Sequence, residues 1–299
     1  MLTHLHPSPV APVRVVILGA NGFIPRALAA KLTADKVSFV AVASQQLDLS
    51  AADAGPKLAA LLQPGDAIVM AAALTPDKGR DLATLMKNLR MAENVAAALS
   101  VKPVAHFIYL SSDAVYDWRH PLISEATAPS PTDLYSTMHL AREQVLAATT
   151  ATIKVPYAIL RPCAVYGPGD THNSYGPNRF ARTALAEGKI RLFGAGEETR
   201  DHVCIDDVVG IIALTLAHRS TGVLNVVSGR SATFAEVAAQ VAALCPQPVA
   251  VESQPQGSPV THRHFDATAL RRAFPAHRSL ALATGLGPLL ASLRGGPAR

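Results

Sequence analysis

Residues 14–25 constrain the fold of this chain more than any other segment. A short apolar run, RVVILG at 14–19, leads into a loop that holds Gly19 and Gly22, and a stretch of helical composition follows. Glycines between a strand and a helix allow a tight turn and let the backbone approach a pyrophosphate, whose charge the helix N-terminus stabilises. The order strand, glycine loop, helix therefore favours the first unit of a dinucleotide-binding domain.

Apolar runs and helical stretches alternate along the first two-thirds of the chain. We expect further buried strands at residues 38–43, 67–71, 106–111 and 158–161, and helices at residues 53–62, 81–100 and 134–150. Near-continuous apolar strands that alternate with helices predict a parallel sheet with both faces covered. The fold class that follows is α/β, with a doubly wound parallel sheet.

The composition changes after Arg161. Residues 167–178 (GPGDTHNSYGPN) predict a long loop, and shorter elements follow: a helix near 180–187, a strand near 190–193, a helix at 206–218, a strand at 224–227 and a helix at 234–244. We expect a dinucleotide-binding domain of residues 12–165 plus about 201–228, and a smaller interleaved substrate-binding region of residues 166–200 and 229–299. Residues 1–12, rich in His and Pro, are expected to be a frayed tail.

Composition disfavours several classes of protein. The formal net charge is +5, but Lys and Arg are scattered, so we expect an anionic small ligand and no nucleic acid. No apolar run reaches the roughly 20 residues of a membrane span. Three widely spaced cysteines fit a reducing compartment, which predicts a cytoplasmic protein. His262 and His264 have no evident third ligand, so no metal site is predicted.

Four segments resemble the motifs of one family. Residues 18–25 (LGANGFIP) resemble its TGxxGxxG loop, with Leu18 for the threonine and Pro25 for the third glycine. Residues 110–116 (LSSDAVY) resemble SSxxVYG, residues 161–168 (RPCAVYGP) resemble RxxNVYGP, and residues 200–208 (RDHVCIDDV) resemble RDxxHVxD. In this order they span nearly the whole chain, which resembles the extended short-chain dehydrogenases/reductases, nucleotide-sugar epimerases and dehydratases among them. The resemblance implies a Rossmann domain.

The same resemblance implies NAD or NADP as the cofactor. The residues that it places against the dinucleotide are Gly19, Asn21, Gly22, Phe23, Ile24, Ser44, Asp48, Leu49, Ala71, Ala72, Asn88 and Pro162. Around Ala43 and Ser44, where an NAD-preferring domain usually offers an acid to the ribose hydroxyls, this chain has none. No arginine follows to favour a 2′-phosphate, so the choice between NAD and NADP stays open. Pro25 falls in the first helical turn, where a missing N–H is tolerated.

Catalysis in that family uses a Ser or Thr together with a Tyr-x-x-x-Lys pair. By resemblance, Ser112 hydrogen-bonds the substrate oxygen and Tyr135 is the acid/base. His139 takes the place of the lysine, four residues after Tyr135 on the same helix face. With an unperturbed pKa of about 6.5, a histidine is mostly neutral near pH 7 and activates the tyrosine less. Either catalysis is eroded, or it persists with a changed pH profile.

The substrate is expected to be a small molecule, with a nucleotide sugar as one candidate. The resemblance assigns to it Asp113, His172, Asn178, Arg182 and Arg200. Ala114 replaces the glutamate that eliminates water in 4,6-dehydratases, which disfavours that reaction. Three alternatives remain for the function: an NAD(P)-dependent epimerase, a carbonyl reductase of a non-sugar substrate, or a catalytically eroded dinucleotide-binding protein. The helices at 81–100 and 134–150 correspond to those that pair two subunits in the family, so the resemblance implies a homodimer.

If the chemistry persists, His139 limits the activation of Tyr135. The substitution His139→Lys is then expected to raise turnover near neutral pH, because a fixed positive charge favours the ionised tyrosine. Steady-state kinetics of the variant against the unaltered protein measure the effect. Equal or lower turnover would count against this role of His139.

Overall fold

The computed structural model describes residues 1–257 and 259–295, so Ser258 and the last four residues of the predicted substrate-binding region lie outside the described residues. Within them, seven strands form a sheet of order β1-β10-β6-β5-β4-β2-β3. β1 runs antiparallel to β10, and the other neighbours are parallel. The strands are β1 (Thr3–His4), β2 (Arg14–Leu18), β3 (Phe39–Val42), β4 (Asp66–Met70), β5 (His106–Leu110), β6 (Tyr157–Pro162) and β10 (Ser220–Val226).

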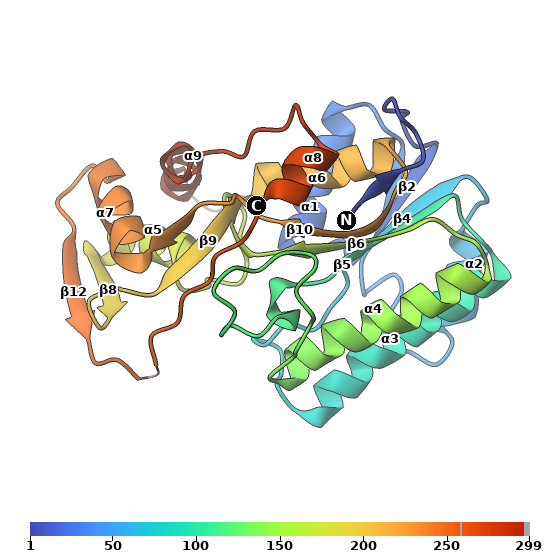
Figure 1. Cartoon of the computed structure of the whole chain (residues 1–299), viewed down its shortest axis with the longest axis horizontal. Helices are drawn as coiled ribbons and strands as arrows, with labels where there is room; N and C mark the ends of the chain where they lie inside the picture. Colours follow the sequence, from blue (N-terminus) through green and yellow to red (C-terminus); the bar gives the residue numbers. More distant parts are fainter. Residues whose placement is uncertain (258, 296–299) are drawn as a thin grey trace.

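Helices cover both faces of this sheet (Figure 1). On one face lie α2 (Ala54–Leu61), α3 (Leu82–Val101) and α4 (Leu134–Thr152), and on the other lie α1 (Phe23–Ala34), α6 (Ile205–Ala217) and α8 (Thr268–Ala273). In β2, Val15 and Ile17 belong to one apolar core, whereas Val16 and Leu18 belong to the other. A strand buried on both sides needs an uninterrupted apolar run, because successive side chains point to opposite faces. The predicted doubly wound parallel sheet is confirmed.

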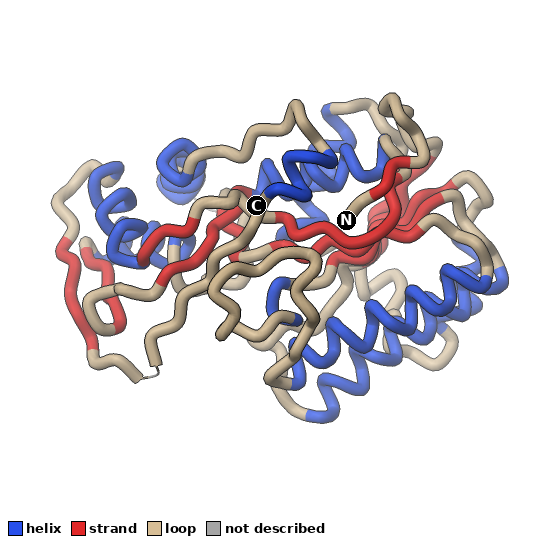
Figure 2. Tube along the Cα trace, viewed as in Figure 1, coloured by secondary structure: helices blue, strands red, loops and turns tan. Residues whose placement is uncertain are grey.

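The later elements form a smaller assembly at one end of the sheet, seen on the left of Figures 1 and 2. Its helices are α5 (Pro177–Glu187), α7 (Phe234–Leu244) and α9 (Leu282–Arg294). β9 (Thr199–Cys204) pairs with β7 (Ala164–Tyr166) and β11 (Ser231–Thr233), and β12 (Ala250–Gln254) pairs with β8 (Lys189–Phe193). The sequence did not indicate β12, whose residues are mostly exposed. The predicted loop at 167–178 ends earlier, because Pro177 begins α5, a position that suits proline.

The N-terminal residues are ordered, so the expectation of a frayed tail was wrong. Thr3 and His4 pair with Thr221 and Ser220 of β10. The His4 ring lies 2.8 Å from Ser220 Oγ through Nδ1 and 2.8 Å from the Ala273 carbonyl oxygen through Nε2. A two-residue edge strand carries no hydrophobic periodicity, so the pattern of the sequence does not reveal it.

A buried polar network anchors α4 to the sheet. Arg161 of β6 binds Glu143 of α4 through two hydrogen bonds of 2.9 and 2.6 Å. Arg161 also donates to Tyr116 Oη at 2.7 Å, and Tyr116 donates to Asn225 Oδ1 of β10 at 2.9 Å. The ion pair is almost fully buried, with exposed fractions of 5% for Arg161 and 1% for Glu143. The network therefore fixes the position of α4 over β6 and β10.

Three buried imidazoles make folding sensitive to acid. Burial lowers the pKa of His106 to about 4, and that of His139 and His202 to about 3. A histidine of the unfolded chain titrates at about 6.5. Below about pH 6.5 the unfolded state therefore binds more protons than the folded state, and the free energy of unfolding falls as the pH falls toward 4.

We expect His202→Leu to weaken this pH dependence, because it removes one of the three buried imidazoles. The two ring nitrogens of His202 have no hydrogen-bond partner among the described residues, so leucine breaks no such bond. Urea unfolding at about pH 7 and about pH 5 measures the change. His120→Leu, at an exposed position, is the matched control and should leave the pH dependence unaltered. Equal pH dependence in the His202 variant and the unaltered protein would contradict the argument.

Candidate active site

The glycine loop between β2 and α1 packs against the backbone that follows β4. Gly19 has φ +96°, which glycine adopts without steric cost. A Cβ on Gly19 would lie 2.8 Å from both N and Cα of Ala72, closer than atoms can approach. Gly22 is the N-cap of α1, and no side chain of the described residues caps this helix, which leaves the N–H groups of its first turn to an anion. Pro25 is buried in that first turn, where the sequence placed it.

The residues predicted to meet the adenosine half follow β3. Ser44 and Asp48 are exposed, whereas Leu49 is buried in the core under α2 and α3. Asn21 of the glycine loop donates a hydrogen bond of 2.9 Å to Gln45 Oε1. Gln45 therefore joins the two loops at this point. Sequence reasoning missed it, because its role depends on a contact between separate loops.

Asn88 holds the segment between β4 and α3. Its Oδ1 accepts the Leu74 N–H at 2.9 Å, and its Nδ2 donates to the Leu74 carbonyl oxygen at 3.1 Å. The Ala71 N–H donates to the Leu18 carbonyl oxygen at 3.0 Å, which continues the ladder beyond β4. Ala71 and Ala72 thus form the wall that faces the glycine loop, and Asn88 keeps the chain after that wall in place.

Ser112 and Tyr135 come together beyond the carboxyl ends of the strands. Ser112 follows β5, and its Oγ accepts the Ala114 N–H at 3.1 Å. Tyr135 lies in the first turn of α4. Burial raises the pKa of Tyr135 to about 12, and a side-chain hydrogen bond with Ser112 opposes that rise. The two residues therefore lie close together, with Tyr135 protonated near neutral pH, and their catalytic role stays a prediction.

His139 does not offer a free imidazole to solvent. It is 3% exposed, and its Nδ1 lies 2.8 Å from Tyr109 Oη of β5. Its ring meets the Tyr135 ring edge to face, with centroids 4.7 Å apart. Nε2 is buried and has no hydrogen-bond partner among the described residues. The burial that lowers the pKa of His139 to about 3 keeps the ring neutral.

Arg142 lies one turn further along α4 and was not among the predicted site residues. It is fully buried and donates to the Ala72 carbonyl oxygen at 2.7 Å. Its other terminal nitrogen is 3.4 Å from Asn88 Oδ1. The guanidinium carbon lies 5.1 Å from the centre of the Tyr109 ring. Helical spacing from Tyr135 would have placed Arg142 on nearly the same face, but its contacts with β4 and β5 depend on the fold.

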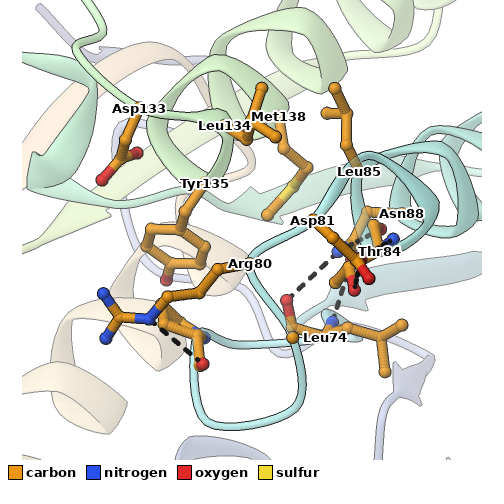
Figure 3. Close-up of a pocket in the computed structure, with 12 residues that line it drawn as sticks. Leu74, Arg80, Asp81, Thr84, Leu85, Asn88, Asp133, Leu134, Tyr135 and Met138 are labelled. Carbon is orange, nitrogen blue, oxygen red and sulfur yellow. Dashed lines mark hydrogen bonds between the residues drawn. The ribbon is translucent and has the colours of Figure 1, made fainter.

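A cavity of about 90 Å³ lies between the first turn of α4 and the segment that precedes α3. Figure 3 shows Tyr135 extending from α4 toward Arg80, with Asn88 and Leu74 on the opposite side. Met138 also lines it. Tyr135 is thus accessible from a pocket whose wall includes one predicted cofactor residue, Asn88.

Two arginines lie near Asp113, one of the predicted substrate residues. Arg200 donates to the Thr261 hydroxyl at 2.7 Å and lies 5.8 Å from the centre of the Phe234 ring. Arg263 forms an ion pair of 2.8 Å with Asp113, the neighbour of Ser112. Burial lowers the pKa of Arg200, and the nearby Arg263 adds to that effect. The sequence indicated Arg200 and Asp113 but missed Arg263, because nothing in its local pattern shows that it reaches Asp113.

The other predicted substrate residues stabilise the segment between β7 and α5. Asn178 is buried, and its Oδ1 accepts the Gly167 N–H at 3.1 Å. Arg182 binds Asp170 at 3.0 Å, and the exposed His172 lies 3.6 Å from Asp77. These contacts order the segment and leave a direct role toward substrate as a prediction. Pro162 ends β6 and is buried.

Comparisons with known proteins identify the family of the chain and agree with its fold. Residues 15–227 match the model of the NAD dependent epimerase/dehydratase family. The dTDP-L-rhamnose 4-epimerase of Burkholderia thailandensis is 38% identical over 128 residues, which are 41% of this chain and 35% of the relative. The match thus spans about a third of that relative's length.

Solved structures of similar fold cover nearly the whole chain. MoeE5 in complex with UDP-glucuronic acid and NAD is 24% identical over 94% of this chain and 99% of its own, with a TM-score of 0.84. The UDP-glucose 4-epimerase of Thermus thermophilus with NAD is 20% identical over 95% of this chain and 100% of its own, with a TM-score of 0.82. RMD from Pseudomonas aeruginosa, complexed with NADPH, is 24% identical over 95% and 99%, with a TM-score of 0.82. At these identities the likeness concerns the fold.

The substitution Gly19→Ala tests the glycine loop. A methyl group there meets the Ala72 backbone in a backbone conformation unfavourable to alanine, so we expect a loss of roughly 1–3 kcal/mol in the free energy of unfolding and weaker dinucleotide binding. Urea unfolding and NADH fluorescence titration measure the two effects. Gly287→Ala is the control, because a Cβ there meets nothing within 4 Å. Equal behaviour of the two variants would refute the close approach.

Proposed function

Because the chain belongs to the NAD-dependent epimerase/dehydratase family, we propose that it transfers a hydride between a nicotinamide dinucleotide and a secondary alcohol or carbonyl of a nucleotide sugar. The observation that carries the proposal is the position of Ser112, which follows β5, close to Tyr135 in the first turn of α4, beyond the carboxyl ends of the strands. Ligands of open α/β sheets bind at this edge. The domain boundaries given above, with catalysis between the two regions, are part of the same proposal.

The residues around this edge fit a dinucleotide. The uncapped first turn of α1 suits a pyrophosphate. Gly19 has no side chain and packs against the Ala72 backbone, so a pyrophosphate can approach the loop closely. Two buried nitrogens, His139 Nε2 and Arg142 Nε, have no partner among the described residues and suit the ribose oxygens of a ligand. Gly19 to Ile24 would hold the pyrophosphate, with Ser44, Asp48 and Leu49 at the adenosine end and Ala71, Ala72, Asn88 and Pro162 toward the nicotinamide end.

When bound, the nicotinamide ring supplies the hydride acceptor or donor. In the oxidative direction Tyr135 Oη would take the proton of the substrate hydroxyl, while the carbon that bears this hydroxyl gives its hydride to the nicotinamide. In the reductive direction Tyr135 returns that proton to the carbonyl oxygen. Ser112 Oγ donates a hydrogen bond to the same oxygen and orients it. Tyr135 must be deprotonated for the oxidative step, so groups that lower its pKa promote this step.

The substrate class rests on charge and on relatives. Arg200 and Arg263 lie near Asp113, the neighbour of Ser112, and two arginines suit the phosphates of an anionic substrate, although Arg200 also pairs with Glu198. The similar proteins are named as acting on dTDP-L-rhamnose or as holding UDP-glucuronic acid. A carbonyl reductase of a non-sugar substrate is the second candidate, because Arg263 is already paired with Asp113.

Assembly and location are proposed on further observations. Apolar side chains at the surface of α3 and α4 support a homodimer through these helices: Leu82, Met86, Val101, Leu134 and Val145 are 40–76% exposed. The cysteines are free, with Cys163 and Cys204 buried, which supports a reducing cytoplasm. Helices long and apolar enough to cross a membrane are absent from the part of the chain that the structure describes.

Mass spectrometry of the ligand released from the purified protein separates the candidate reactions. An epimerase recycles its cofactor, so we expect a tightly held NAD or NADP and interconversion of sugar epimers without added cofactor. A reductase would need added NADPH or NADH. A protein that binds the dinucleotide but turns over neither nucleotide sugars nor ketones would be the eroded form, which the raised pKa of Tyr135 favours.

The substitution Tyr135→Phe is expected to lower kcat about a hundredfold or more, because it removes the proton acceptor, while the affinity for the dinucleotide stays close to that of the unaltered protein. Steady-state kinetics and cofactor titration measure the two quantities. Tyr157→Phe is the control, since the Tyr157 hydroxyl is buried without a hydrogen-bond partner among the described residues. Turnover that survives Tyr135→Phe would exclude Tyr135 as the acid/base.

A further inference from the structure

We propose that Arg142 is a positioning residue that supplies the fixed positive charge of the site, in place of a cation at position 139. This inference rests on the proposed function, in which Tyr135 is the acid/base. Arg142 is not marked by the motif pattern. If the inference holds, the positive charge that is missing at position 139 is supplied from position 142 of the same helix.

The direction of the Arg142 side chain brings its charge back toward Tyr135. Side chains of a helix lean toward its N-terminus. One guanidinium nitrogen accordingly lies 3.6 Å from Met138 Sδ, one turn nearer Tyr135 than its own Cα. The other donates to the Ala72 carbonyl oxygen at 2.7 Å. The charge is therefore at the level of residues 138 and 139, next to Met138 and Asn88, which line the pocket in Figure 3.

That charge is not neutralised by an acid. Arg142 has 0% exposure, and its polar contacts are a carbonyl oxygen, an amide oxygen and a thioether. Among the described residues no carboxylate forms an ion pair with it, and the adjacent Glu143 is bound to Arg161. Nε has no partner within the same residues. A buried cation without a counterion is costly, and its field on neighbouring groups is screened much less than that of an exposed charge.

His139 cannot carry the charge while Arg142 does. Its imidazole is buried, bonded to the Tyr109 hydroxyl through Nδ1, and burial together with the nearby Arg142 lowers its pKa to about 3. The neutral ring packs between Tyr109 and Tyr135, with its edge or face against each. His139 thus contacts Tyr135 as a neutral group, while the charge of Arg142 lies over the Tyr109 ring on which His139 also packs.

Other charged groups around Tyr135 act in both directions. Asp113, which follows Ser112, and Asp133, at the start of α4, raise the pKa of Tyr135, whereas Arg142 and the hydrogen bond with Ser112 lower it. Arg80 faces the phenol across the pocket (Figure 3). Asp113 is itself bound to Arg263. Arg142 is the buried cation of this set, and its removal therefore changes the field at Tyr135 with little compensation from solvent.

The test measures the ionisation of Tyr135 directly, without substrate. 3-Fluorotyrosine placed at position 135 lowers the pKa of the phenol, and ¹⁹F NMR follows its titration at that single site. We expect Arg142→Gln to raise the apparent pKa by about one unit and Arg142→Lys to restore most of the difference. His139→Gln, which exchanges one neutral polar side chain for another, is the matched control and should shift it far less. A shift in Arg142→Gln no larger than in His139→Gln overturns the proposal.

Three further measurements decide the matter if Arg142→Gln does not fold. The double variant with His139→Lys and Arg142→Gln moves the cation to position 139, and we expect it to titrate like the unaltered protein. The single His139→Lys, with Arg142 present, places two cations together and should lose stability. In the unaltered protein, ¹⁵N NMR should show His139 neutral down to about pH 5. Protonation of His139 above that pH overturns the proposal, because His139 would then supply the charge.

The titration also separates this proposal from the proposed function. A protein without turnover whose Tyr135 titration still depends on Arg142 would refute the catalytic assignment alone. A protein with turnover whose Tyr135 titration ignores Arg142 would refute the relocated charge alone.

Discussion

The ion pair between Arg161 and Glu143 is the interaction on which the site depends. It ties α4 to β6 in a region from which water is excluded, and Tyr116 and Asn225 extend it to β10. Breaking a buried pair by removing one partner leaves an uncompensated charge and typically costs about 3–5 kcal/mol. Tyr135 is two turns before Glu143 on the same rigid helix, so the pair sets the distance of the phenol from Ser112 at the end of β5.

A second buried cation, Arg142, differs from Arg161 in how its charge is compensated. The charge of Arg161 is balanced by Glu143, and the pair fixes the position of α4. Arg142 has its guanidinium held by uncharged oxygens, so its field remains available to the groups around it. Adjacent positions of α4 thus hold Glu143, which fixes the helix on the sheet, and Arg142, the cation proposed to act on Tyr135. Loss of Glu143 would disturb the placement of Tyr135, whereas loss of Arg142 would change the ionisation of its phenol.

Much of the scaffold could be predicted because its signals are local. β2, β4 and β5 are continuous apolar runs, as strands buried on both faces must be, and the loop at Gly19 is a local backbone requirement. Ser112 and Tyr135 were located by motif spacing, and the structure places them close enough for Ser112 to affect the pKa of Tyr135. By contrast, β1 and β12 are short and polar, so nothing in their sequence distinguishes them from loops. Arg142 and Arg263 depend on contacts with distant elements, and Asn178, placed on the substrate side, has its amide engaged by the chain that precedes α5.

The pairing of β1 with β10 has a consequence for how the molecule is made. Thr3 lies opposite Thr221, so β1 finds its partner only after more than two hundred further residues have been synthesised. Such a contact closes a very long loop and contributes little to early folding. Until β10 arrives, the Rossmann sheet has an open edge at β6, which is a surface prone to pairing with other chains. Completion of the sheet is therefore a late event in folding. The contacts of His4 with Ser220 and Ala273 can form only after this step.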